Sequence, residues 1–173
     1  MFGKAVYTKE ELKEAVSTYV SRAAEKLRRQ GFAAGMLDVF AVTNGKNGDK
    51  YAYDPHSDHQ YAILPRATSF TNELISFALP LVDKLFRPGF KYQKAGVILS
   101  NLVPDEAVQS DIFEQGERKH QKTLMETVDN INFAMRGDVL KYVSSGLKRN
   151  WKMRQEMRSG KYTTRWEELY EIG

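Results

Sequence analysis

Five residues in the middle of the chain form a short peptide whose composition suits docking into a pocket of another protein. Gln109, Ser110, Asp111, Ile112 and Phe113 stand among acidic and polar residues, where an Ile-Phe pair has no obvious core of its own to fill. A glutamine amide can hydrogen-bond at the rim of a pocket, and two apolar side chains can fill a cleft. The alternative is that Ile112 and Phe113 fold back onto this protein.

Residues that could support catalysis are few and scattered. Two-metal phosphoryl transfer needs carboxylates that hold two metal ions about 3.5–4 Å apart. The acidic residues of an expected loop and helix show no such grouping: Asp54, Asp58, Glu73 and Asp83. Cysteine is absent, which excludes thiol nucleophiles and thiolate metal sites. His56 and His59 lie near Asp54 and Asp58, a spacing that could bind a metal, but a polar loop with incidental histidines is the simpler interpretation. We expect no catalytic residue, metal site or cofactor in this chain.

Charge is distributed unevenly along the chain, whose net charge is +4. Residues 1–105 carry 14 basic and 11 acidic groups, residues 106–147 carry 5 and 7, and residues 148–173 carry 7 and 4. Two basic lobes therefore flank an acidic linker. A basic surface suits a phosphate backbone, although the same net charge occurs in many proteins that never bind nucleic acid.

The C-terminal basic lobe also contains aromatic residues. Between Lys148 and Arg165 there are seven basic residues and one acidic residue, with Trp151, Tyr162 and two methionines interleaved. Basic groups mixed with aromatic rings suit single-stranded nucleic acid, because bases stack on the rings. Alternatively, Trp151 and Met157 pack on a helix of this protein and the basic groups simply face solvent.

Periodicity and capping signals predict the elements that position these residues. We expect a strand at 2–6, a helix capped by Thr8 and Glu11 and ended by Gly31, a strand at 32–43, a loop at 44–60, a strand at 61–68, a helix at 71–86, a strand from Tyr92 to Pro104, a helix at 117–135 and a short strand at 139–143. Pro65 predicts an edge strand or a bulge, and Pro80 predicts a kink within one continuous helix.

This order of elements predicts an α+β fold of the split βαβ type. Four antiparallel strands would form one sheet, both helices would cover one face, and a smaller helical extension would follow. The uncovered face would present Lys4, Arg66 and Lys94. We divide the chain into a domain at 1–105, a linker with the peptide at 106–116 and a basic tail region at 117–173. No apolar run approaches the ~20 residues that a membrane-spanning helix needs.

Several segments, in their order and spacing, resemble the C-terminal part of UmuC-type Y-family DNA polymerases. They are Phe2-Gly3-Lys4, Ala34-Gly35-Met36-Leu37, Tyr92-Gln93-Lys94-Ala95-Gly96-Val97, Gln109 to Phe113, Gly146-Leu147, Trp151-Lys152-Met153-Arg154 and Lys161-Tyr162-Thr163-Thr164-Arg165-Trp166. The resemblance covers nearly the whole chain. It implies a fragment that holds the little-finger domain, the clamp peptide and the tail, without palm, fingers or thumb.

The resemblance also implies partners and binding residues. The little finger would lie in the major groove near the primer–template junction, and Gln109 to Phe113 would bind the β sliding clamp. The DNA-binding candidates are Gly3, Lys4, Arg66, Lys91, Lys94, Lys148, Arg149, Lys152, Arg154 and Arg158. A UmuD'-type subunit and a RecA filament would be further partners, in the bacterial cytoplasm during the SOS response. Mg²⁺ would be needed only by the absent palm.

The chain departs from the family pattern at several positions. Ser110 stands where an apolar or long side chain is common, and Ile112 replaces the usual leucine, so we expect weakened docking. Ser159-Gly160-Lys161 replaces the more usual Ser-Pro-basic run. Two other functions remain open: a stand-alone split βαβ module that binds protein or RNA, and an enzyme with an unrecognised site. The mainly aliphatic central strands disfavour RNA binding, which usually stacks bases on paired aromatic residues.

Overall fold

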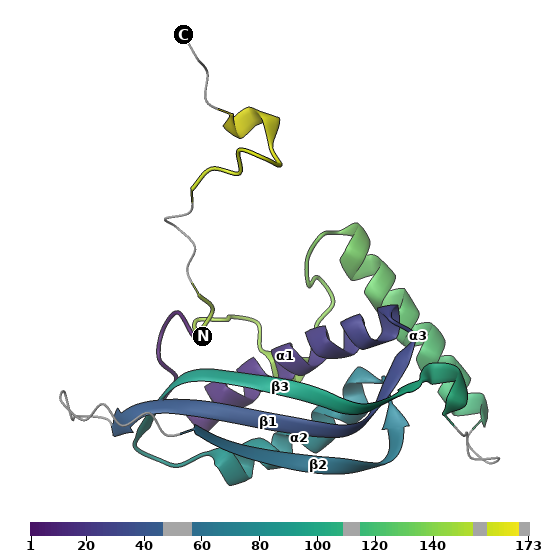
Figure 1. The fold of residues 1–173 in the computed structure, drawn as a ribbon, viewed down its shortest axis with the longest axis horizontal. Coiled ribbons are helices and arrows are strands. Elements are labelled where there is room, and N and C mark those ends of the chain that lie inside the picture. The colour runs from purple at the N-terminus through teal and green to yellow at the C-terminus, as the bar shows by residue number, and fades with distance from the viewer. Residues whose placement is uncertain (47–56, 109–114, 154–158, 170–173) are drawn as a thin grey trace.

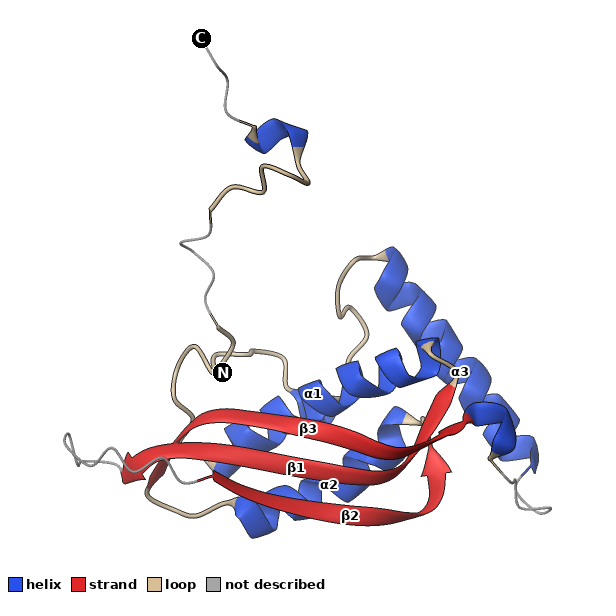
Figure 2. Cartoon of the chain, in the orientation of Figure 1, coloured by secondary structure: helices blue, strands red, loops and turns tan. Residues whose placement is uncertain are grey.

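The computed structural model describes residues 1–46, 57–108, 115–153 and 159–169. A three-stranded antiparallel sheet has two helices across one face and a third helix at its side (Figure 1). The elements are α1 (Lys9–Arg29), β1 (Phe32–Lys46), β2 (Ser57–Thr68), α2 (Thr71–Leu85), β3 (Phe90–Pro104) and α3 (Gln115–Ala134). Figure 2 shows the same elements by type, with the C-terminal tail leading away from the body. The α+β class is confirmed, and the layout is roughly that of a split βαβ fold.

The first helix begins and ends where the sequence predicts. The Thr8 hydroxyl accepts a hydrogen bond from the Glu11 N–H at 3.2 Å, as an N-cap should. The Glu11 carboxylate accepts from the N–H of Tyr7, at 3.5 Å, rather than from that of Thr8. Gly31 follows the helix with a φ of +72°, a left-handed conformation that glycine adopts without steric cost.

The sheet has the order β2-β1-β3, and the predicted four-stranded sheet is not confirmed. Residues 2–6, predicted to be a strand, form only an isolated bridge between Val6 and Tyr92. The N–H of Phe2 also donates to the carbonyl of Gln93 at 2.8 Å, but the N–H of Gly3 donates to the carbonyl of Trp151 at 2.9 Å. The segment therefore follows the edge of β3, and its ladder is interrupted where its backbone bonds to the C-terminal region.

The core lies between the sheet and the two helices. Leu37, Val39 and Ala41 lie on one face of β1 and are buried in this core, as their period of two predicts. The buried stripes of the helices face them: Leu12, Val16 and Val20 on α1, and Leu74, Ala78 and Val82 on α2. Each fully buried aliphatic side chain contributes roughly 1.5–3 kcal/mol to folding.

Pro65 and Pro80 lie in elements that accommodate a proline. β2 is an edge strand, and its register against β1 shifts from Ala34–Thr68 to Met36–Ile63, so residues 64–67 bulge opposite Gly35. Pro65 lies in this bulge, which confirms the prediction of an edge strand or bulge. α2 continues through Pro80 as one helix, as predicted, with the proline exposed to solvent.

The C-terminal region packs against the body. α3 confirms the helix predicted at 117–135, but the strand predicted at 139–143 is wrong. The Asn132 side chain accepts from the N–H of Leu140 at 2.8 Å and donates to its carbonyl at 3.1 Å, so these backbone groups bind a side chain instead of a ladder. A short 3₁₀ turn follows at Val143–Ser145.

Trp151 is the last buried side chain among the residues that the structure describes. Its ring packs edge-on against Phe2 at 5.9 Å and Tyr19 at 5.6 Å between centroids. The interpretation that Trp151 packs within this protein is therefore right, but its partners are the N-terminal segment and α1 rather than the third helix.

Candidate nucleic-acid interface

The face of the sheet opposite the helices is the open face. The register pairs Met36, Asp38, Phe40 and Val42 of β1 with residues of both neighbouring strands that point to the same side. These are His59, Tyr61 and Ile63 on β2, and Lys94, Gly96, Ile98 and Ser100 on β3. Tyr61, Ile63 and Ile98 are exposed, and 70% of Ile63 is accessible to solvent. The exposed side chains near the centre of the open face are therefore aliphatic and aromatic rather than basic.

A phenylalanine and a glycine form a flat platform on this face. Phe40 on β1 lies opposite Gly96 on β3, and a Cβ added to Gly96 would overlap the Phe40 ring. Glycine in a strand often marks such a close approach of another group to the backbone. The Phe40 ring can lie across β3 only because position 96 has no side chain.

One acidic residue occupies the centre of the open face. The Asp38 side chain is 17% exposed and lies between Tyr61 and Ile98 in the register. Its Oδ2 is 3.4 Å from Nδ1 of His59, and its buried Oδ1 has no hydrogen-bond partner among the described residues. A carboxylate at this position repels phosphate groups. The sequence places Asp38 on this face, but only the strand register shows that it is central.

The predicted cations of the domain lie around the open face and do not form one cluster. Lys94 is exposed on β3 of the open face, and Lys91 is half-buried near the start of that strand. Arg66 is half-buried in the bulge of β2, at the opposite edge of the sheet. Gly3 and Lys4 are exposed in the N-terminal segment, so Lys4 lies outside the three strands and not within a fourth strand as expected.

The cations of the C-terminal region differ in their surroundings. Lys148 and Lys152 are exposed, whereas the Arg149 side chain is only 14% exposed and its Nη1 lies 2.6 Å from Oδ2 of Asp138. Arg22 approaches the same oxygen at 3.3 Å. Arg149 is thus engaged in joining the C-terminal region to α1. Arg154 and Arg158 lie outside the described residues.

Both arginines lower the pKa of the Asp138 carboxyl group. Partial burial acts to raise its pKa, but the hydrogen bond from Arg149 and the charge and hydrogen bond of Arg22 outweigh burial, so the pKa lies below its ordinary value. The ionised form is therefore favoured, and the three side chains form a charged junction at the base of the tail.

The peptide Gln109 to Phe113 lies outside the described residues, but both elements that flank it are described. The 3₁₀ turn Asp105–Ala107 precedes it, and α3 follows. The Asp105 carboxylate accepts from Nζ of Lys122 at 2.6 Å and from the Ser69 hydroxyl at 3.4 Å. The chain is thus fixed to the body on both sides of the peptide.

The described residues contain no group of three or more side chains placed to hold a metal ion. Of the four residues considered for such a site, Asp54 and His56 lie outside the described part of the chain. Asp58 binds Arg87 at 3.0 Å instead. Among the same described residues, no helix is long and apolar enough to cross a membrane.

Comparison with known proteins agrees with the sequence motifs. Residues 1–112 match the impB/mucB/samB family C-terminal domain, and residues 122–172 match a domain of unknown function, DUF4113. The chain is 32% identical to the protein UmuC of Salmonella typhimurium, over 99% of this chain and 40% of that protein. It is 31% identical to the protein ImpB of Salmonella typhimurium and 31% identical to the protein MucB of Escherichia coli, over 97% of this chain and 39% of each relative. The chain spans about 40% of the length of these curated relatives, and it belongs to the impB/mucB/samB family, whose C-terminal domain it contains.

Proposed function

We propose that this chain is the non-catalytic, DNA-binding and clamp-binding C-terminal part of an error-prone translesion DNA polymerase. The observation that carries the proposal is the match of residues 1–112 to the family's C-terminal domain, together with the similarity to UmuC. Because the chain spans about 40% of that relative, polymerase chemistry and its Mg²⁺ ions would belong to the remainder. This part would hold DNA and partner proteins in place.

DNA would be held from the rims of the open face. Lys94 and Lys91 on β3 and Arg66 on β2 stand on either side of β1, and neighbouring strands lie about 4.8 Å apart. Contacts between such side chains and phosphates fix the position of a duplex without reading its sequence. The Asp38 carboxylate would keep phosphates away from the centre of the sheet, so that the backbone contacts concentrate at its edges.

Protein partners would be recruited through other parts of the chain. We propose that Gln109 to Phe113 dock on the β sliding clamp, and that the parent protein acts with a UmuD'-type subunit and a RecA filament in the bacterial cytoplasm. The fixation of the chain on both sides of the peptide, through Asp105 and through α3, supports a role as a displayed docking segment.

Binding of a fluorescent primed duplex over a range of salt concentrations tests the DNA-binding role. Affinity should fall with salt and should not depend on sequence, because the neutralised phosphates release counterions. The double variant Lys91→Ala/Lys94→Ala should reduce the slope of log affinity against log salt by up to about 0.9 for each phosphate that is no longer neutralised. Lys26→Ala/Lys84→Ala removes the same charge from exposed positions on the helices and is the matched control. Equal effects of the two double variants would contradict the assigned interface.

A protein-binding role for the open face is the second candidate. Its favouring observation is the exposure of Tyr61, Ile63 and Ile98 around the acidic Asp38, a composition closer to a protein interface than to a phosphate-binding surface. On this alternative, Tyr61→Ala/Ile98→Ala would abolish capture of a protein partner and leave DNA affinity and its salt dependence unchanged.

A further inference from the structure

The two tryptophans of the chain occupy opposite environments. Trp151 is 5% exposed and completes the core, whereas Trp166 is 86% exposed on residues 159–169, here named the tail segment. Tyr162 and Leu169 are also exposed on the tail segment. Figure 1 shows the tail segment lying apart from the body. Exposed aromatic side chains that gather in so short a segment indicate a binding surface rather than packing within the fold.

Local hydrogen bonds give the tail segment a defined shape. The Lys161 carbonyl accepts from the N–H groups of Thr164 and Arg165, both at 2.9 Å, and a 3₁₀ turn follows at Trp166–Glu168. The Tyr162 ring lies against Gly160, where an added Cβ would come within 2.7 Å of the ring. These turns enclose a hollow of about 210 Å³. Its lining residues are Tyr162, Thr163, Thr164, Arg165, Trp166 and Leu169.

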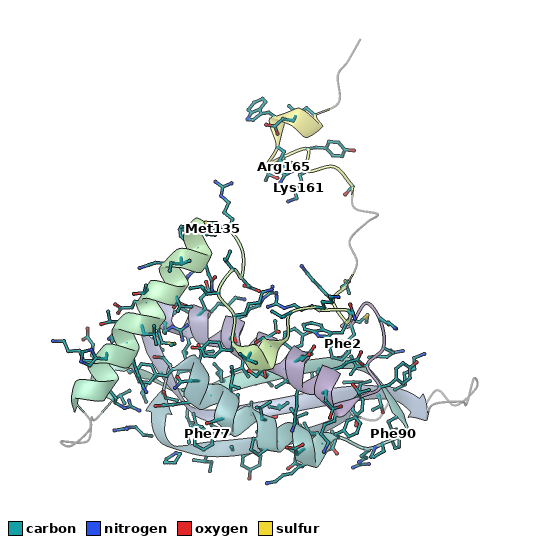
Figure 3. All side chains as sticks on the ribbon, turned by 180° about the vertical axis from the view of Figure 1, so that it is seen from behind. Phe2, Phe77, Phe90, Met135, Lys161 and Arg165 are labelled. Atoms are coloured by element: carbon teal, nitrogen blue, oxygen red, sulfur yellow. The ribbon has the colours of Figure 1, made fainter. Side chains whose placement is uncertain are left out.

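Of the described side chains that line this hollow, the charged one is a cation, Arg165. Lys161 and Arg165 are exposed beside the two rings, and Figure 3 shows both on the tail segment, away from the body. The tail segment holds two cations, Lys161 and Arg165, and two glutamates, Glu167 and Glu168. The described side chain of Glu167 does not line the hollow. The tail segment therefore offers aromatic faces and cations together, on a part of the chain that makes no contribution to the core.

We propose that the tail segment is a binding site for single-stranded DNA, in which nucleobases stack on Tyr162 and Trp166 while Lys161 and Arg165 hold the neighbouring phosphates. Single strands present unstacked base faces to aromatic rings, whereas a duplex keeps its bases stacked on one another. An acidic protein would be attracted by the same cations, but it presents aromatic faces only at occasional side chains, whereas a single strand presents a base face at every nucleotide. Only the choice of DNA over RNA rests on the function proposed above.

Tryptophan fluorescence tests the site directly in the full chain. Titration with an oligothymidylate of about 16 nucleotides should quench the emission of exposed Trp166, because stacked bases lie on its ring, and leave that of buried Trp151 unchanged. Trp166→Phe retains an aromatic face and should bind the oligonucleotide while losing the quenching. Tyr162→Ala/Trp166→Ala should weaken binding of a labelled oligonucleotide about tenfold or more, at an unchanged melting temperature.

Three results would overturn the site. They are unchanged affinity of Tyr162→Ala/Trp166→Ala, quenching that persists in Trp166→Phe, and displacement of the oligonucleotide by a polyglutamate peptide at equal charge concentration. The last result would identify the tail segment as a surface for acidic proteins. The function proposed above is tested separately by Lys91→Ala/Lys94→Ala on primed duplex. The site on the tail segment can therefore fail while the DNA-binding assignment of the open face stands, and the open-face assignment can fail while the tail site stands.

Discussion

Arg28 and Asp129 form a bidentate ion pair that joins the last turn of α1 to the C-terminal half of α3. Nε and Nη2 of Arg28 lie 2.7 and 2.8 Å from the two carboxylate oxygens of Asp129. Nη1 of the same guanidinium donates to the Ser69 carbonyl at 2.6 Å and to the Thr71 hydroxyl at 2.9 Å, at the start of α2. One side chain thus joins three helices. Arg28 belongs to the segment that matches the family's C-terminal domain and Asp129 to the segment that matches DUF4113, so the two matched segments share one folded body.

Replacing Asp129 by asparagine should destabilise the protein by about 3 kcal/mol, because Arg28 would keep a largely buried charge without its counterion. The two side chains are only 11% and 17% exposed. Urea unfolding gives the free energy of unfolding of both proteins. Glu25→Gln breaks the more exposed pair with Arg29 and should cost about 0.5 kcal/mol or less. A similar loss in both variants would show that the Arg28 pair contributes no more than a surface pair.

Trp151→Ala should lower the free energy of unfolding by about 3 kcal/mol or more, since it leaves a cavity between Phe2 and Tyr19. Trp166→Ala removes the same side chain from an exposed position and should leave the denaturation midpoint unchanged. Equal stability of the two variants would contradict the burial of Trp151.

A chain truncated before α3 loses Trp151 and its packing against Phe2 and Tyr19. We therefore expect it to melt at a lower temperature than the full chain.

Stability should depend on pH through Asp138. Its pKa in the folded protein lies below the ordinary value of 3.8, so the stabilisation is present above that value and is lost as the pH falls through the folded pKa. Asp138→Asn should therefore be less stable than the parent protein near pH 6, and the difference should shrink towards about pH 2. Unfolding measured across this range checks the direction. A difference that grows in acid would mean that the carboxyl is not held ionised by Arg149 and Arg22.

Ile112→Ala/Phe113→Ala should reduce binding to the sliding clamp about a hundredfold or more, because each buried side chain is worth about 1.5–3 kcal/mol and each 1.4 kcal/mol is a factor of ten. The melting temperature should stay unchanged if both side chains serve only the partner. Surface plasmon resonance on immobilised clamp and a thermal melt measure the two quantities. Ser110→Ala is a control within the same peptide. Unchanged clamp binding with a lower melting temperature would mean that the pair packs on this protein.

Local signals predicted those parts of the fold that depend on neighbouring residues. The cap at Thr8, the stop at Gly31, the alternation of Leu37, Val39 and Ala41 and the bulge at Pro65 all follow from short-range chemistry. The strands expected at 2–6 and 139–143 failed for a different reason. Gly3 bonds to Trp151 and Leu140 to Asn132, and no pattern within either segment announces those distant partners.

In the candidate site, too, local sequence predicts some features and distant partners determine the others. Alternation places Lys94, Asp38 and Phe40 on faces of their strands, but only the register puts Asp38 at the centre and Phe40 against Gly96. Lys148, Arg149 and Lys152 look alike in sequence, yet Arg149 is turned into the body by Asp138 while the lysines remain exposed. The exposure of Tyr61 and Ile63 could have been anticipated by extending the alternation along β2.

The fixed ends around Gln109 to Phe113 limit how far a clamp bound to this peptide could stand from the proposed DNA-binding face of the sheet. Asp105 is fastened by Lys122, and α3 resumes at Gln115. Seven residue steps from Val108 to Gln115 span at most about 25 Å when fully extended. A sliding clamp bound to this peptide would therefore be tethered close to the open face. DNA that dissociates from the open face would then rebind at a high effective concentration rather than diffuse into solution.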